Sequence, residues 1–192
     1  SSPSRGLGDV YKRQLIMIGK LLVASPSILN DYVFSRSVIL MIENSGTGSM
    51  GFIVNKQTNY CLNDLIQGSK LNVPLFEGGP VNNDKLFYIH NNKNIPESTK
   101  IGKNLFWGGD FNFIMNGIKE KKFHINSFKF ISGYSGWEKN QLENEIKLKS
   151  WLIIKNDYDL IKIKNNLWSK IIKDIGGETA YFFMAPDYPG LN

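Results

Sequence analysis

The sequence predicts an α+β fold, because strand-like and helix-like runs follow one another without the regular alternation of a doubly wound sheet. An apolar run at residues 38–42, a polar turn cluster at residues 44–49 and a returning run at residues 51–55 predict a β-hairpin. The continuous apolar run is typical of a strand that is covered on both faces. Other short apolar runs predict strands at residues 21–24, 75–76, 86–90, 105–107, 128–131 and 151–154.

Two short helices are predicted between these strands. Asn63 or Asp64 can cap a helix that ends at Gly68. Asp110 can cap a second helix over the next six residues, which Gly117 would close.

Longer helix signals lie in the second half of the chain. Ser135 and Glu138 have the spacing of a capping box, which predicts a helix directly after a glycine turn. The apolar residues within 167–175 have helical spacing and precede a glycine pair. The polar residues 91–102 contain a proline and are expected to form an exposed connection.

The first residues do not resemble the rest of the chain. Residues 1–14 resemble the translation of a transposase-type sequencing adaptor, so we exclude them from the fold prediction and expect them to be disordered. Met17 is the expected natural start. Residues 15–192 are expected to form a single compact domain, long enough to bury a hydrophobic core.

Charge and cysteine content indicate the compartment. The chain has 23 basic and 17 acidic residues, a formal net charge of +6, and many of its cations are lysines among asparagines and isoleucines. The amino-acid bias of an AT-rich genome would explain this mild excess of positive charge at least as readily as a nucleic-acid partner would. Cys61 is alone, and no apolar run approaches the roughly 20 residues that cross a bilayer. We expect a cytoplasmic protein without membrane contact.

Three glycine turns, at residues 77–80, 107–110 and 133–137, form the candidate binding surface. Glycine permits tight bends and close approach of a ligand to the backbone. The third turn leads into a predicted helix N-terminus, where free N–H groups favour an anion, with Tyr134 and Trp137 beside it. The alternative is that Ser135 only caps the helix. Asp110 is itself an anion at a helix start and would occupy those donors in the second turn.

Other chemistry has weaker support in the sequence. Glu77 and Asp110 could hold a metal or form an acid–base pair, but no histidine or third acid has a suitable spacing. Ser135 could be a nucleophile with His90 or His124 as its base, but the sequence around it is not G-x-S-x-G.

A short basic run at residues 119–122 could contact nucleic acid. No helix-turn-helix signature or zinc-ligand spacing accompanies it, so we interpret the run as a solvated face.

The chain resembles the YqgE/AlgH family of small bacterial proteins, also called UPF0301 or DUF179, and among its members most resembles the Bacteroidetes branch. The matching stretches follow one another over everything after residue 14: 19–26, 34–41, 51–55, 77–81, 105–111, 133–137, Trp151 and Trp168. One departure is Asn140, which stands where relatives usually have glycine before the glutamine.

The resemblance implies an α+β fold with curved, mixed and branched β-sheets flanked by short helices, and no established enzymatic activity. Some members are labelled transcriptional regulators, although the family has no standard DNA-binding motif.

We therefore expect a non-enzymatic binding or regulatory protein without a cofactor or metal, and the alternative is a hydrolase or transferase acting on a phosphorylated or acyl substrate. Its partner would be a small anionic ligand or a protein, and we do not expect direct DNA binding. The candidate ligand contacts are Gly78, Gly79, Trp107, Gly108, Gly109, Asp110, Gly133, Tyr134, Ser135, Gly136 and Trp137.

Overall fold

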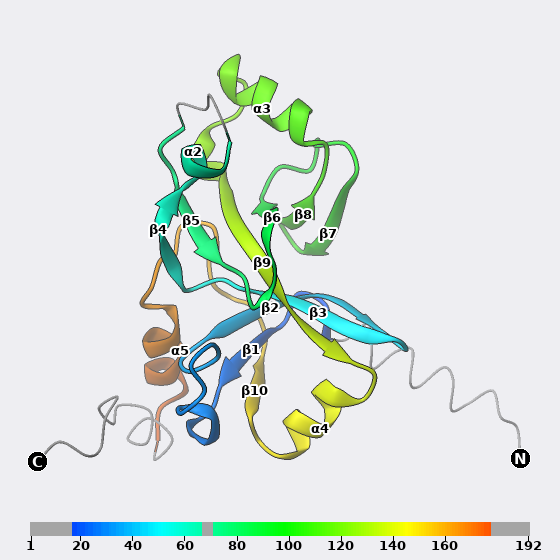
Figure 1. Ribbon diagram of the computed structural model, residues 1–192, viewed down its shortest axis with the longest axis vertical. Helices are drawn as coiled ribbons and strands as arrows, with labels where there is room; N and C mark the ends of the chain where they lie inside the picture. The colour runs from blue at the N-terminus through cyan, green and yellow to red at the C-terminus, as the bar shows by residue number, and fades with distance from the viewer. Residues whose placement is uncertain (1–16, 67–70, 178–192) are drawn as a thin grey trace, which may run out of the picture.

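The computed structural model describes residues 17–66 and 71–177, and in this part of the chain ten strands form one curled, branched sheet flanked by helices (Figure 1). The main path runs β10-β1-β2-β3-β9-β6-β8-β7, and the β4–β5 pair branches from β9. All pairs are antiparallel except β5 with β9, so the sheet is mixed. The predicted α+β class, with a curved mixed sheet in a single domain, is confirmed.

The lower lobe in Figure 1 contains the hairpin and the sheet edge formed by β10. Its elements are β1 Leu21–Ala24, a 3-10 turn Pro26–Ile28, β2 Val38–Ser45, β3 Gly48–Ile53, α4 Gln141–Lys147, β10 Trp151–Ile154 and α5 Leu167–Ile175. Side chains of β2 alternate between two core clusters, with Leu40 in one and Ile39 and Met41 in the other. The continuous apolar run is therefore buried on both faces, as its sequence predicts.

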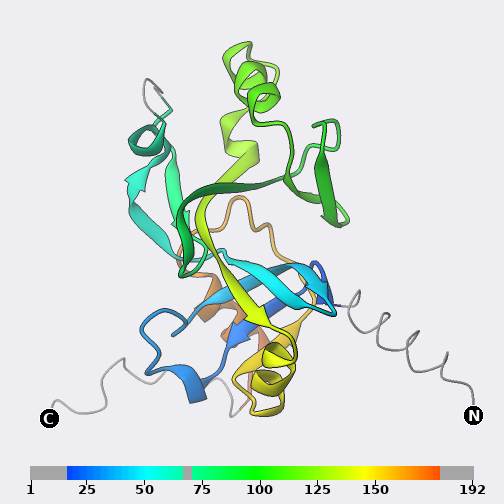
Figure 2. The same cartoon turned by 45° about the vertical axis from the view of Figure 1, so that its right-hand side comes forward.

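The upper lobe contains the branch of the sheet and two further helices. Its elements are β4 Gln57–Cys61, α2 Leu62–Leu65, β5 Pro74–Glu77, β6 Val81–His90, β7 Ser98–Gly102, β8 Leu105–Gly108, α3 Phe111–Lys119 and a 3-10 turn Ile125–Ser127. A third core cluster, which includes Tyr88, Ile114 and Phe130, lies here. Figure 2 shows the β7–β8 hairpin standing apart from the β4–β5 pair.

The long strand β9, Phe128–Glu138, joins the two lobes. Its first half pairs with β5 and β6, and its second half pairs with β3 from Gly51↔Ser135 to Gly48↔Glu138. Gly133 lies between these halves with φ +70°, a value that favours glycine. The strand can therefore change partners without ending.

The connection from β10 to α5, residues 155–166, closes one side of the molecule. In Figure 1 it rises between the lobes and then descends into α5. The helix packs through the buried Leu167, Ile171 and Ile172, and Trp168 Nε1 donates a hydrogen bond of 3.0 Å to the Ala24 carbonyl. The predicted helix over residues 167–175 is confirmed.

Several local predictions differ from the structure. The helix predicted directly after Ser135 is wrong, because residues 135–138 continue β9 and the helix begins at Gln141. Asn140 precedes it with φ 65°, the left-handed conformation that asparagine tolerates better than most residues.

Two other differences concern the upper lobe. The exposed connection predicted at residues 91–102 includes strand β7 and the buried Ile95 and Ile101. Asp110 does cap α3, but this helix continues past Gly117 to Lys119. Strand β4 was not predicted, because its polar sequence has no apolar alternation.

The segments 1–14 and 186–192 and the predicted helix end at Gly68 lie outside the described residues. Within the described residues, no helix has the length and apolar character needed to span a bilayer.

Candidate functional site

The first and third glycine turns lie against each other. The Gly78 amide donates to the Ser132 carbonyl at 2.8 Å, and the Gly78 carbonyl accepts from Ile53 N at 2.9 Å and from Ser135 Oγ at 3.0 Å. A Cβ on Gly79 would lie 2.4 Å from the Tyr134 carbonyl oxygen. Glycine is thus required there so that two backbone segments can touch.

This contact changes the interpretation of the third turn. Ser135 is 1 % exposed and its hydroxyl already donates to the protein backbone. Because Ser135 lies within β9, no helix N-terminus is available there to bind an anion. The predicted helix start at Ser135 is wrong, and ligand contacts at Gly78, Gly79, Gly133 and Gly136 stay a prediction.

The second glycine turn lies between β8 and α3, and its carbonyls are bound by other side chains. Tyr88 donates its hydroxyl to the Gly109 carbonyl at 2.5 Å, and His90 Nε2 lies 3.0 Å from the Gly108 carbonyl. Asp110 accepts from the Phe113 amide at 3.0 Å. A Cβ on Gly108 would meet nothing within 4 Å, so this side of the turn is open.

The three predicted aromatic walls do not form one surface. Trp107 packs edge-on against Phe52 at 5.9 Å, and Phe87 links Phe52 to Tyr134 at ring distances of 5.1 and 5.9 Å. Trp137 belongs to the opposite core cluster. The Trp107 indole nitrogen is buried without a hydrogen-bond partner among the described residues.

The possible bases for a Ser135 nucleophile do not contact it. Within the described part of the chain, the Ser135 hydroxyl bonds to neither a histidine nor a carboxylate. His90 is fully buried between two phenylalanine rings, and burial lowers its pKa, which favours the neutral imidazole. His124 Nδ1 accepts from the Asn126 amide at 3.2 Å. No group of three or more potential metal ligands occurs among residues 17–66 and 71–177.

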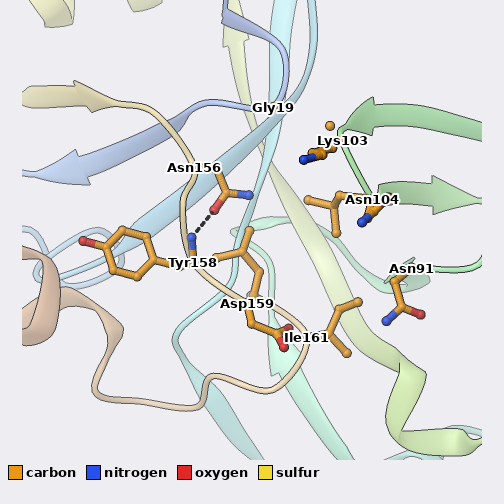
Figure 3. A pocket seen from close by; sticks show the side chains of 11 residues that line it. Gly19, Asn91, Lys103, Asn104, Asn156, Tyr158, Asp159 and Ile161 are labelled. Carbon is orange, nitrogen blue, oxygen red and sulfur yellow. Dashed lines mark hydrogen bonds between the residues drawn. The ribbon is translucent and has the colours of Figure 1, made fainter.

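A recess of about 340 Å³ lies between the β7–β8 hairpin and the 155–166 connection, and we call it the polar pocket (Figure 3). The described residues that line it come from four segments: Gly19 before β1, Asn91 after β6, the tip of the β7–β8 hairpin, and the connection. The lining residues are Gly19, Asn91, Gly102, Lys103, Asn104, Leu105, Asn156, Tyr158, Asp159, Leu160 and Ile161.

The polar pocket presents unpaired hydrogen-bond donors. In Figure 3 the side chains of Lys103, Asn104 and Asn156 surround the space between the hairpin and the connection. Asn156 Oδ1 accepts from the Tyr158 amide at 3.2 Å, which orients its side-chain NH₂ group. Among the described residues, Lys103 and Asn104 have no hydrogen-bond or ion-pair partner on their side chains.

Among the described residues of this lining the only acid is Asp159, which lies 3.4 Å from Lys162 Nζ. Its charge is therefore partly balanced outside the pocket. Sequence patterns missed the site because its residues are far apart along the chain, and the only local signal is the Gly102-Lys103-Asn104 tip of a hairpin.

The geometry describes an α+β protein with a branched, curled sheet and a solvent-open polar recess between its lobes. The AlgH-like family model (DUF179) matches residues 21–180, so the chain belongs to this family. A UPF0301 protein from Bacteroides thetaiotaomicron is 36% identical and covers 96% of this chain and 97% of its own length. A UPF0301 protein from Cytophaga hutchinsonii is 34% identical, with coverage of 91% and 98%.

Two solved structures share the fold. The AlgH protein from Pseudomonas aeruginosa superposes with a TM-score of 0.70 at 21% identity and covers 97% of both chains. A protein from Corynebacterium diphtheriae gives a TM-score of 0.71 at 19% identity, covering 88% of this chain and 92% of its own. At these identities the structures show the fold alone.

Proposed function

We propose that this chain is a cytoplasmic, non-enzymatic binding protein that takes a small anionic ligand into the polar pocket. The observation that carries the proposal is the set of unpaired donors on Lys103, Asn104 and Asn156. An ammonium and amide NH₂ groups bind carboxylate or phosphate oxygens through charge-assisted hydrogen bonds. Asp159 at the far side favours a ligand that also carries a hydroxyl or amine.

A regulatory role follows from the position of the pocket. Its walls belong to the β7–β8 hairpin and to the connection that leads into α5, so a ligand would hold these two segments together. A binding event there can change the surface that the chain offers to a protein partner. Any effect on transcription, which the family label suggests, would in this proposal be indirect.

Thermal melting of the full chain tests the proposal. The probes are inorganic phosphate, malonate and glucose 6-phosphate, with glucose as the uncharged control. A ligand at about tenfold excess over its Kd stabilises the native state by about 1.4 kcal/mol, which raises Tm by about 3–5 °C.

Two lysine variants make the test specific. Lys103→Met should abolish the shift, whereas Lys100→Met, an exposed lysine on β7 outside the pocket, should retain it. The proposal is rejected if no anionic probe shifts Tm, or if the two variants respond alike.

A further inference from the structure

A second recess of about 390 Å³ lies against residues 161–164, farther along the 155–166 connection, and we call it the lysine pocket. It occupies the corner between the start of β5, the start of β9 and the connection. Its lining combines aromatic and branched side chains with three lysines: Val73, Pro74, Phe76, Ile125, Asn126, Phe128, Lys129, Phe130, Ile161, Lys162, Ile163 and Lys164.

Lys129 places a buried ammonium in the wall of this pocket. Its Nζ donates to the Val54 and Ile163 carbonyls at 2.8 and 2.6 Å and lies 4.1 Å from the centre of the Phe76 ring. The side chain is 3 % exposed. Within the described residues no carboxylate lies within ion-pair distance of it, so its direct contacts are two carbonyl dipoles and a ring face, and the charge of Asp159 acts on it from farther away.

The other charges at the pocket have the same sign. Lys164 has no ion-pair partner in the described part of the chain, and Lys162 contacts Asp159 only at 3.4 Å. No acidic residue lines the pocket within segments 17–66 and 71–177. The exposed ammoniums of Lys162 and Lys164 thus place positive charge beside the apolar walls of the pocket.

We propose that the lysine pocket binds a small carboxylate with an apolar body, such as an aromatic or branched-chain acid. The carboxylate would pair with the exposed ammonium of Lys164, and the body would bury apolar area against Phe76, Phe128 or Phe130. The volume lies at the lower end of the range for small-molecule sites, so the ligand is small. This site is separate from the polar pocket, and Ile161 is the one described residue that lines both.

The test is a calorimetric titration of the full chain with three probes. Sodium phenylacetate has both the charge and the ring, phenylacetamide has the ring without the charge, and sodium acetate has the charge without the ring. We expect phenylacetate to bind at least tenfold more tightly than either of the others, because only it satisfies both parts of the site.

Substitutions place the binding in this pocket. Lys164→Met should weaken phenylacetate binding at least fivefold, whereas Lys139→Met, an exposed lysine elsewhere, should leave it unchanged. Both positions are exposed, so both variants should fold, and their melting curves check this. Lys103→Met in the polar pocket should also leave phenylacetate binding unchanged, which separates this proposal from the previous one.

Three results would overturn the proposal. They are the absence of phenylacetate binding, equal affinity for phenylacetate and phenylacetamide, and equal affinity of the Lys164→Met and Lys139→Met variants.

Discussion

Lys129 should make the protein more stable as the pH rises from about 7 towards 10. Burial lowers the pKa of its ammonium from 10.5 to about 7, and the charge of Asp159 opposes this only in part. In the unfolded chain the lysine keeps its ordinary pKa. Between these two values the unfolded chain therefore binds more protons than the native protein, and the free energy of unfolding rises with pH.

The size of the effect follows from the difference between the two pKa values. At about 1.36 kcal/mol per pH unit, the change from 10.5 to about 7 corresponds to roughly 5 kcal/mol over the whole window. This figure is an upper bound, because the Val54 and Ile163 carbonyls stabilise the charged amine through hydrogen bonds.

Urea unfolding followed by tryptophan fluorescence at pH 7, 8 and 9 measures the effect. The perturbation is Lys129→Met, which removes the titrating group, and Lys139→Met is the exposed control. The unfolding free energy of the wild type minus that of Lys129→Met should increase by about 2 kcal/mol from pH 7 to pH 9. A difference that stays constant across this range would show that the ammonium is not desolvated in the native protein.

Two further predictions concern the folded core and its backbone contacts. Gly79→Ala should destabilise the protein by about 2–3 kcal/mol, because the added Cβ would lie 2.4 Å from backbone atoms of Tyr134. Gly108→Ala has open space around its Cβ, so it should destabilise the protein by only about 1–2 kcal/mol, which is what a positive φ costs a residue with a side chain. Thermal melting compares the two, and equal losses would contradict the argument. Glu145→Ala should lower the free energy of unfolding by about 2–4 kcal/mol. One oxygen of the Glu145 carboxylate accepts from both the Trp137 and Trp151 indoles at 2.8 Å, so its loss leaves two donors unpaired. The exposed Glu143→Ala is the control, and a similar melting temperature for both variants would refute the bridging role.

Elements with strong local signals could be predicted from the sequence. The β2–β3 hairpin and the helix over residues 167–175 have apolar patterns that only one kind of structure satisfies. The Asp110 cap was predictable for the same reason, because a single side chain and one nearby amide define it.

The path of β9 could not be predicted, because glycines and a capping-box spacing favour a turn and a helix start at residues 133–138. The strand continues there because β3 supplies hydrogen-bond partners from far away in the sequence, as at Gly51↔Ser135. This is a tertiary effect that local propensity does not contain.

The polar pocket depends even more on long-range arrangement. Lys103 and Asn156 are far apart along the chain and meet only because the connection after β10 crosses beside the β7–β8 hairpin. In the sequence each is an ordinary polar residue in a loop. The first and third glycine turns also come from distant parts of the chain, and backbone fills the space where they touch.

Because β9 pairs with strands of both lobes, its position late in the chain affects folding during translation and the folding of truncated fragments. Neither lobe has a complete sheet until residues 128–138 are available, although most other strands precede them. We therefore expect the nascent polypeptide to remain without stable structure until this segment has left the ribosome. A protein truncated before residue 128 should yield no folded fragment, and the intact chain should lose both lobes in one cooperative transition.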